Sequence, residues 1–205
     1  MWLPLTPTAL LAQPMLLMQM VATVSKYLAI IAALAASPAL ATGLEIDISG
    51  KANGTVVIDL FEDVAPKHVE QITALAAEGA YNGVVFHRVI EGFMAQTGDV
   101  EFGKAGGDTA GAGRGGSDRP DLPAEFSELN FERGIVGMAR SQSPNSANSQ
   151  FFIMFDEGSF LNGQYTVVGK VTSGMDVVDE IKLGTGGNGA VVGTPDQMMA
   201  VRVTE

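Results

Sequence analysis

The sequence of 205 residues contains no cysteine and only two histidines, His68 and His87. Without cysteine the chain has no disulfide, no thiolate metal site and no cysteine nucleophile. The absence of cysteine does not indicate whether the protein works in a reducing or an oxidising compartment. Two histidines are also too few for a metal site built from several imidazoles. We therefore expect no metal and no cofactor, and the chemistry has to be carried by other side chains.

Basic residues are scarce as well, because the chain has 12 Lys and Arg against 23 Asp and Glu, a formal net charge of -11. Nucleic acids are bound through clustered Lys and Arg, and the sequence has no basic stripe, so we expect no nucleic-acid partner. The acidic balance either keeps a domain soluble or steers basic partners toward it.

The first 41 residues contain no Asp or Glu and a single basic residue, Lys26. Lys26 precedes an apolar run over residues 27–36, and the tripeptide Ala39-Leu40-Ala41 follows. A charged start, a short apolar core and an Ala-x-Ala site are typical of a secretory signal peptide. We predict that residues 1–41 are a signal peptide that is cleaved after Ala41.

The position of the initiator methionine and the cleavage of the signal peptide each have an alternative. Met18 and Met20 are candidate initiators, because the charged residue and the apolar core come late in the chain. The core is shorter than the ~20 apolar residues that span a bilayer, so we expect residues 42–205 to be exported without stable membrane insertion. The alternative is an uncleaved signal, extended by part of residues 10–24, that anchors the domain in the inner membrane.

Residues 42–205 carry the pattern of many short strands. Apolar residues alternate over 44–49 and again over 55–61. Asn53-Gly54 between them predicts a tight hairpin turn with positive φ at both positions. Further strands are predicted over residues 134–139, 150–155, 165–171 and 199–203. Without regular alternation of strand and helix, this order indicates one compact domain built on an antiparallel sheet or barrel.

Two segments have helical spacing. The first predicted helix begins at Pro66, which needs no amide donor in the first turn, and ends at Gly79. His68 lies off the apolar face of this helix, and we interpret it as a solvated histidine. The second predicted helix lies within residues 175–184.

Residues 103–117 contain seven glycines, and the part from Gly111 to Gly116 matches the dinucleotide fingerprint G-x-G-x-x-G. That fingerprint needs a strand before it and a helix after it, whereas Pro120 and Pro123 follow it here. We interpret the segment as a long functional or covering loop rather than a cofactor site.

The segment over residues 86–99, FHRVIEGFMAQTGD, has the clearest chemical character. Strand alternation and a bend at Gly92 put a cation, Arg88, and an amide, Gln96, on one surface with large apolar side chains. His87 is expected to point to the opposite face, away from this surface. The set contains no nucleophile and no proton relay, so it is predicted to bind and polarise a group rather than to break a bond.

This segment resembles the signature of cyclophilin-type peptidyl-prolyl isomerases. Three further blocks agree with that family in order and spacing, over residues 137–140, 144–152 and 160–171. The resemblance spans roughly residues 45–203. It implies a mainly β fold, a closed eight-stranded antiparallel β-barrel capped by two α-helices.

The resemblance implies a peptidyl-prolyl cis-trans isomerase that rotates Xaa-Pro bonds and assists the folding of exported, proline-containing polypeptides. By position in the motifs, Arg88 corresponds to the catalytic arginine, Gln96 to a residue that bonds substrate backbone, and Phe93 to part of the proline pocket. The other substrate-binding positions are Met94, Ala139, Arg140, Gln150, Phe152, Phe160, Leu161 and Tyr165. A proline-peptide binding module or holdase without turnover is the alternative, and the presence of Arg88 and Gln96 favours the enzyme.

These residue types suit the reaction. Amide resonance gives the rotation a barrier of ~18–20 kcal/mol, and no covalent bond has to break. An apolar pocket that holds the proline ring, and a donor aimed at the twisted amide, lower that barrier. The forked, permanently charged guanidinium of Arg88 suits this role better than the point charge of a lysine.

Two positions depart from many eukaryotic members of the family. Phe160 stands where they carry tryptophan, and Tyr165 stands where they carry histidine. Both departures resemble bacterial exported cyclophilins, so they bear on inhibition more than on isomerase activity. Together with the predicted signal peptide, the resemblance implies a periplasmic protein. Loss of the indole donor and of its larger face predicts weak binding of cyclosporin.

Overall fold

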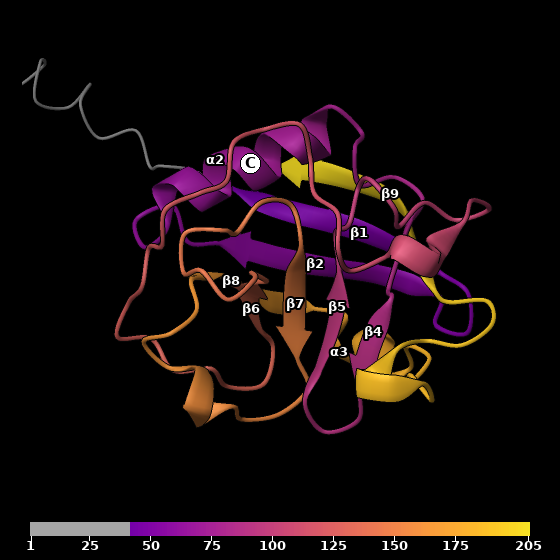
Figure 1. Ribbon diagram of the computed structural model, residues 1–205. Helices are drawn as coiled ribbons and strands as arrows, with labels where there is room; N and C mark the ends of the chain where they lie inside the picture. Colours follow the sequence, from indigo (N-terminus) through magenta and orange to yellow (C-terminus); the bar gives the residue numbers. More distant parts are fainter. Residues whose placement is uncertain (1–41) are drawn as a thin grey trace, which may run out of the picture. The chain divides into compact units, whose positions relative to one another are not determined.

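The computed structural model describes residues 42–205, so the predicted signal peptide, residues 1–41, lies outside the described part of the chain. Two α-helices are present there, α2 (Pro66–Ala77) and α3 (Met175–Asp179), with three short 3₁₀ turns, η1 (Thr109–Gly111), η2 (Ser159–Leu161) and η3 (Gly187–Gly189). The strands are β1 (Gly43–Ser49), β2 (Gly54–Leu60), β3 (Val84–Val85), β4 (Arg88–Ile90), β5 (Met94–Thr97), β6 (Ile135–Met138), β7 (Phe151–Met154), β8 (Val167–Ser173) and β9 (Gln197–Thr204). Figure 1 uses these labels.

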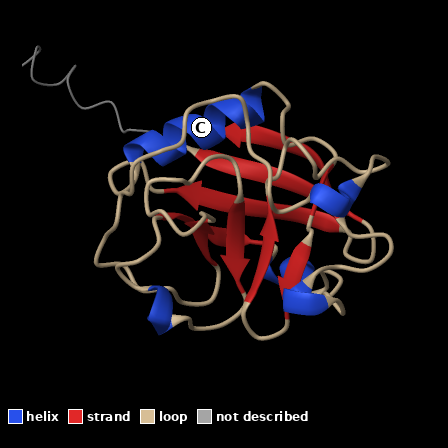
Figure 2. Ribbon diagram, viewed as in Figure 1, coloured by secondary structure: helices blue, strands red, loops and turns tan. Residues whose placement is uncertain are grey.

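All nine strands belong to one antiparallel sheet, in the order β3-β9-β1-β2-β8-β6-β7-β5-β4. The sheet curls into an open half-barrel, as Figures 1 and 2 show. The mainly β prediction is confirmed, but the closed eight-stranded barrel is wrong, because β3 and β4 stand at the two ends of the order and do not pair.

The outer edge of β4 is occupied by irregular chain instead of a strand. Gly184 N donates to Val89 O at 2.9 Å, and Val191 N donates to His87 O at 3.0 Å. These bonds satisfy backbone groups that would otherwise be left open at a sheet edge. The loop over residues 184–191 therefore replaces the strand pairing that would close the barrel.

The predicted first helix is confirmed, since α2 begins at Pro66 and the chain leaves it through Gly79 at φ 72°. Its apolar stripe is buried and packs into the main core, together with alternate residues of β1 and β2. Figure 2 shows α2 lying along one side of the sheet, where it runs beside β9. The second predicted helix is present as α3, but it is only five residues long.

The first hairpin forms as predicted, but its turn differs. Strands β1 and β2 pair from Gly43–Asp59 to Ile48–Gly54, and residues 50–53 form a loop longer than a two-residue turn. Asn53 does not adopt a positive φ, and its side-chain amide donates to Gly50 O at 2.9 Å. The tight Asn53-Gly54 turn is therefore wrong. The reason is that buried Ala52 donates its N–H to the carboxylate of Asp196 at 2.8 Å, which folds the loop inward.

His68 is fully buried, so its interpretation as a solvated histidine is wrong. Its Nδ1 lies 2.6 Å from Oε2 of Glu125, which belongs to a distant loop. The same carboxylate oxygen accepts the backbone N–H groups of Lys67 at 3.1 Å and His68 at 3.2 Å. The loop covers a helix face that sequence periodicity assigns to solvent, and Glu125 caps the first turn of α2.

The Glu125 cap makes the stability of the fold depend on pH. Burial raises the pKa of Glu125, but the hydrogen bonds from His68 and from two backbone amides outweigh it and lower the pKa below the ordinary value. A carboxyl group with a lowered pKa in the folded state stabilises the fold above its unfolded pKa of about 4.3. That contribution is lost as the pH falls through the folded pKa.

We predict that Glu125→Ala lowers the free energy of unfolding by about 1–2 kcal/mol at pH 7, because it removes a helix cap and leaves buried donors unpaired. Urea unfolding followed by circular dichroism measures the change. Glu128→Ala, at an exposed position of the same loop, is the control and should be near neutral. At pH 3 the difference between wild type and Glu125→Ala should shrink. An equal effect of the two substitutions at pH 7 would contradict the capping role.

Candidate functional site

The register of the sheet brings the predicted site residues together. Arg88 on β4 is the direct partner of Gln96 on β5, and Gln96 is the partner of Phe152 on β7. Directly paired residues of neighbouring strands project to the same face of a sheet. One row across three strands therefore carries a cation, an amide and an aromatic ring.

This row lies in a cavity of about 690 Å³. Ten of the eleven residues predicted for the site line it, namely Arg88, Phe93, Met94, Gln96, Ala139, Arg140, Phe152, Phe160, Leu161 and Tyr165. The eleventh, Gln150, lines an adjoining cavity of about 370 Å³ that shares several walls with the first. The two cavities together form one groove.

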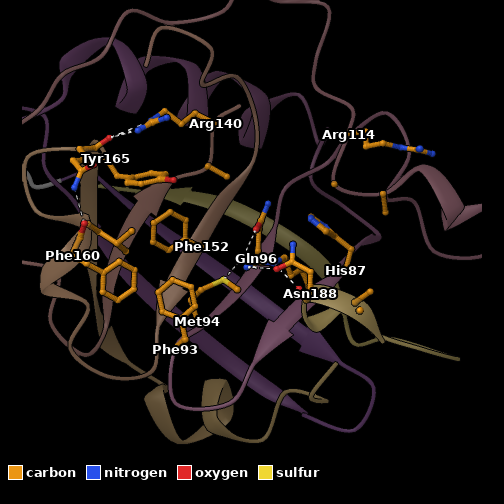
Figure 3. A pocket seen from close by; sticks show the side chains of 18 residues that line it. His87, Phe93, Met94, Gln96, Arg114, Arg140, Phe152, Phe160, Tyr165 and Asn188 are labelled. Carbon is orange, nitrogen blue, oxygen red and sulfur yellow. Dashed lines mark hydrogen bonds between the residues drawn. The ribbon is translucent and has the colours of Figure 1, made fainter. Parts of the chain in front are cut away.

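One end of the first cavity is apolar. Met94, Phe152 and Leu161 are buried in a satellite core beneath it, and partly buried Phe93 packs against them. The rings of Phe93 and Phe160 lie 5.4 Å apart between centroids, with Phe160 still 64% exposed at the rim. Figure 3 shows these aromatic rings gathered on one side of the pocket, with Asn188 and His87 on the other side. This end has the size and polarity to hold a small apolar ring.

A chain of hydrogen bonds crosses the floor of the groove. Arg88 Nη1 donates to Gln96 Oε1 at 3.2 Å, and Gln96 Nε2 donates to Gln150 Oε1 at 2.9 Å. Gln150 Nε2 donates in turn to Gly115 O at 2.8 Å. Each amide is used as both donor and acceptor, so the chain has one direction and orients the guanidinium at its end.

The guanidinium of Arg88 is half-buried and carries no counter-ion. Burial lowers the pKa of Arg88, and the group still stays charged at neutral pH because the ordinary pKa of arginine is so high. Within residues 42–205 no carboxylate forms an ion pair with it. The cation is therefore available to an acceptor that enters the pocket.

Arg140, the second predicted arginine, is held differently. Its guanidinium lies 4.3 Å from the centroid of the Tyr165 ring, and its Nη2 donates to Gln164 O at 2.8 Å. A cation stacked on an aromatic face and bonded to a carbonyl is stabilised in place. Arg140 therefore forms a fixed wall between the two cavities.

His87 lines the cavity, so the prediction that it points away is wrong. It stands in the two-residue link between β3 and β4, where the alternation of strand side chains no longer applies. Both ring nitrogens are buried without a hydrogen-bond partner among the described residues. Burial lowers the pKa of His87 to about 4, so the imidazole is neutral at physiological pH.

The glycine-rich loop contributes Ala112, Gly113 and Arg114 to the cavity, which agrees with its interpretation as a functional or covering loop. The carboxylate of Asp99 holds it, because Oδ2 accepts the N–H groups of Gly113 at 2.7 Å and Gly115 at 2.9 Å. The sequence prediction assigned no role to Asp99, which lies two residues after β5 and shortly before the glycine run.

Asn188, at the centre of η3, was missed by the sequence prediction. Its main-chain O accepts Arg88 Nε at 2.9 Å, and its Oδ1 accepts Arg88 Nη2 at 3.2 Å. The two residues are 100 positions apart, so no local pattern joins them.

The site combines an apolar pocket, an arginine without a counter-ion and a row of amides, and this combination is suited to binding and polarising a peptide group. The family model of cyclophilin type peptidyl-prolyl cis-trans isomerases matches residues 44–203. The chain belongs to this family, and the resemblance of its motifs is confirmed.

Relatives and solved structures agree with this membership. A protein of Brucella suis named "Probable peptidyl-prolyl cis-trans isomerase" is 64% identical over 153 residues, which is 74% of this chain and 78% of that protein. A crystal structure of a cyclophilin type peptidyl-prolyl cis-trans isomerase from Cryptosporidium parvum has a TM-score of 0.68 and 26% identity, and covers 81% of this chain and 99% of that chain. A structure of that protein in the presence of the dipeptide Ala-Pro has a TM-score of 0.66 and 27% identity, over 80% and 99% of the two chains.

We predict that the imidazole of His87 stays neutral down to about pH 5, since burial lowers its pKa to about 4. The unfolded chain, with an ordinary histidine pKa of about 6.5, then binds the proton first, so His87 reduces stability as the pH falls from about 6.5 to 4. NMR titration of the ring signals measures the midpoint, and His87→Gln assigns them. A midpoint for His87 above pH 6 would contradict a buried ring without partners.

Proposed function

We propose that Arg88 is the catalytic residue of this isomerase and that the apolar end of the cavity holds the proline ring of the substrate. The observation that carries the proposal is the half-buried guanidinium without a counter-ion, placed beside a ring-sized apolar pocket. The proline ring would contact Phe93, Met94 and Phe152. A structural neighbour that was solved in the presence of Ala-Pro supports a proline peptide as the ligand.

The mechanism follows from the electronic structure of the amide. Rotation about the Xaa-Pro bond removes resonance, so the proline nitrogen of the twisted amide gains a lone pair that accepts a hydrogen bond. Arg88 donates to this nitrogen more strongly than to the planar ground state, and only such differential binding speeds the reaction. Exclusion of water from the pocket strengthens this electrostatic term.

The rest of the substrate would lie along the adjoining cavity. Gln96, Ala139, Arg140 and Gln150 line its walls and present amide and guanidinium groups to an extended chain. We propose that Gln96 bonds substrate backbone and that the other three hold the residues before the proline. Weak binding of cyclosporin remains a prediction, supported by an exposed rim residue, Phe160, that has no N–H donor.

We predict that Arg88→Ala lowers kcat/KM by two to three orders of magnitude, which corresponds to ~3–4 kcal/mol of transition-state stabilisation. Arg88→Lys should recover only a small part, because a lysine lacks the planar fork. The measurement is protease-coupled isomerisation of an Ala-Pro or Gly-Pro peptide.

Arg202→Ala is the matched control for loss of a surface arginine, since Arg202 pairs with Glu45 and Asp47 on the outer face of β1 and β9. It should leave kcat/KM unchanged. If wild type and Arg88→Ala both bind peptide but show equal, near-zero turnover, the protein is a proline-peptide binding module and the catalytic proposal fails.

We also propose that the domain acts on polypeptides exported to a periplasm, after removal of residues 1–41. The support is the run from Lys26 to Ala41 in the sequence. Within residues 42–205 no helix is long and apolar enough to cross a membrane. Uncatalysed prolyl isomerisation takes tens to hundreds of seconds and can limit folding, so an isomerase is useful where exported chains fold.

We predict that the chain, expressed whole in a bacterium, is recovered from the periplasmic fraction with Thr42 as its first residue. Mass spectrometry of the purified protein identifies this terminus. Ala41→Leu should block cleavage, because the position before the cut needs a small residue, and it serves as the control. An intact chain held in the membrane fraction would instead establish the inner-membrane anchor.

A further inference from the structure

The loop over residues 184–191 brings one polar side chain to the guanidinium of Arg88. The two ends of this loop are hydrogen-bonded to the edge of β4, as described above. Ala190 of the loop also forms an isolated β-bridge with Arg88. Arg88 is the first residue of β4. The position of the loop is therefore tied to the strand that carries the arginine, and Asn188 at its centre faces the cavity (Figure 3).

Asn188 occupies one whole edge of the guanidinium. The Nε and Nη2 donors of Arg88 reach its main-chain and side-chain oxygens, while Nη1 reaches Gln96 on the other side. A guanidinium has five N–H groups in a fixed plane, so acceptors on two edges set its orientation. Three N–H groups are used by these oxygens, and the second N–H of Nη1 contacts Met94 Sδ at 3.6 Å. The second N–H of Nη2 remains without a partner among the described residues.

The backbone of Asn188 has φ 54° and ψ 29°, and within residues 42–205 it is the single non-glycine residue with a positive φ. This left-handed conformation is unfavourable for most L-residues, is tolerated best by asparagine and aspartate among them, and is freely adopted by glycine. Glycine stands on both sides of Asn188, at positions 187 and 189. Asn188 therefore carries a side chain at a position where glycine would fit the backbone without strain. Residues in such backbone conformations cluster at functional sites.

We propose that Asn188 is a positioning residue for the isomerase reaction, whose two oxygens hold the guanidinium of Arg88 with its unused N–H toward the proline pocket. The inference rests on the proposed catalytic role of Arg88. A donor that is already oriented loses no rotamer freedom when the amide twists, so fixing it favours the transition state. Nothing about the affinity for the planar substrate has to change.

The test compares Asn188→Gly with Asn188→Asp. Glycine keeps the main-chain carbonyl and adopts the positive φ freely, so it removes only the side-chain oxygen. We expect kcat/KM to fall about 5–10-fold through kcat, which corresponds to the ~1–1.4 kcal/mol of one ordinary hydrogen bond, with KM within about twofold. Aspartate tolerates this backbone conformation but puts a carboxylate against the guanidinium, so it should lower kcat/KM at least as far as glycine does, because the ion pair competes with the neutral substrate.

A purely structural role for Asn188 gives the opposite ranking. Glycine would then be at least as active as asparagine, and that result would overturn the proposal. Thr185→Gly removes an exposed side chain from the same loop, outside the cavity, and should leave kcat/KM unchanged. Thermal unfolding of each variant shows whether a loss of rate reflects a loss of fold.

A double variant distinguishes failure of the positioning role of Asn188 from failure of the catalytic role of Arg88. In Arg88→Lys the fork is absent, so adding Asn188→Gly should cause no further loss, whereas a full additional loss would overturn the positioning role. If Arg88→Ala leaves activity intact, the catalytic proposal itself fails. If Arg88→Ala lowers activity and Asn188→Gly does not, only the positioning role fails.

Discussion

The site depends most on the hydrogen bonds that the buried carboxylate of Asp99 accepts from the main chain. This carboxylate accepts four main-chain hydrogen bonds, two from the residues just beyond it and two from Gly113 and Gly115 in the glycine-rich loop. A charge without solvent is stable only when its oxygens are bonded, and here the donors come from chain that has no strand or α-helix of its own. Gly115 connects this anchor to the site. Its carbonyl accepts the hydrogen bond of Gln150, the first in the line of amides that ends at Arg88.

Strand register is the second constraint on the site. Arg88, Gln96 and Phe152 face the groove together because they are direct partners across three strands, and a slip of one residue would turn any of them to the other side. Gly137 continues the row into β6. A Cβ atom there would come within 2.6 Å of the rings of Phe131 and Phe152. Only glycine at this position leaves room for the two rings, and Phe152 lines the pocket.

Sequence alone predicted the parts of the site that follow from local periodicity or from motifs. Arg88 and Gln96 belong to one hairpin, where alternation suffices, and the apolar and groove positions came from the family motifs. The errors involve either distant segments of the chain or segments without a regular period. A loop 57 residues away buries His68, an irregular link sets the direction of His87, and the loop that bears Asn188 takes the place of a barrel-closing strand. No helical or strand period contains such contacts.

The distribution of charge explains how an acidic chain keeps a cationic donor in an apolar pocket. The lining of both cavities, all within residues 42–205, includes Arg88, Arg114 and Arg140 but no Asp or Glu, although the chain carries a net charge of -11. A carboxylate beside Arg88 would form a bidentate pair and use the N–H groups that a weaker amide acceptor needs. Neutral oxygens of Gln96 and Asn188 orient the guanidinium without cancelling its charge. Amides and carbonyls, and not ion pairs, are therefore the groups that can hold such an arginine ready for a neutral substrate.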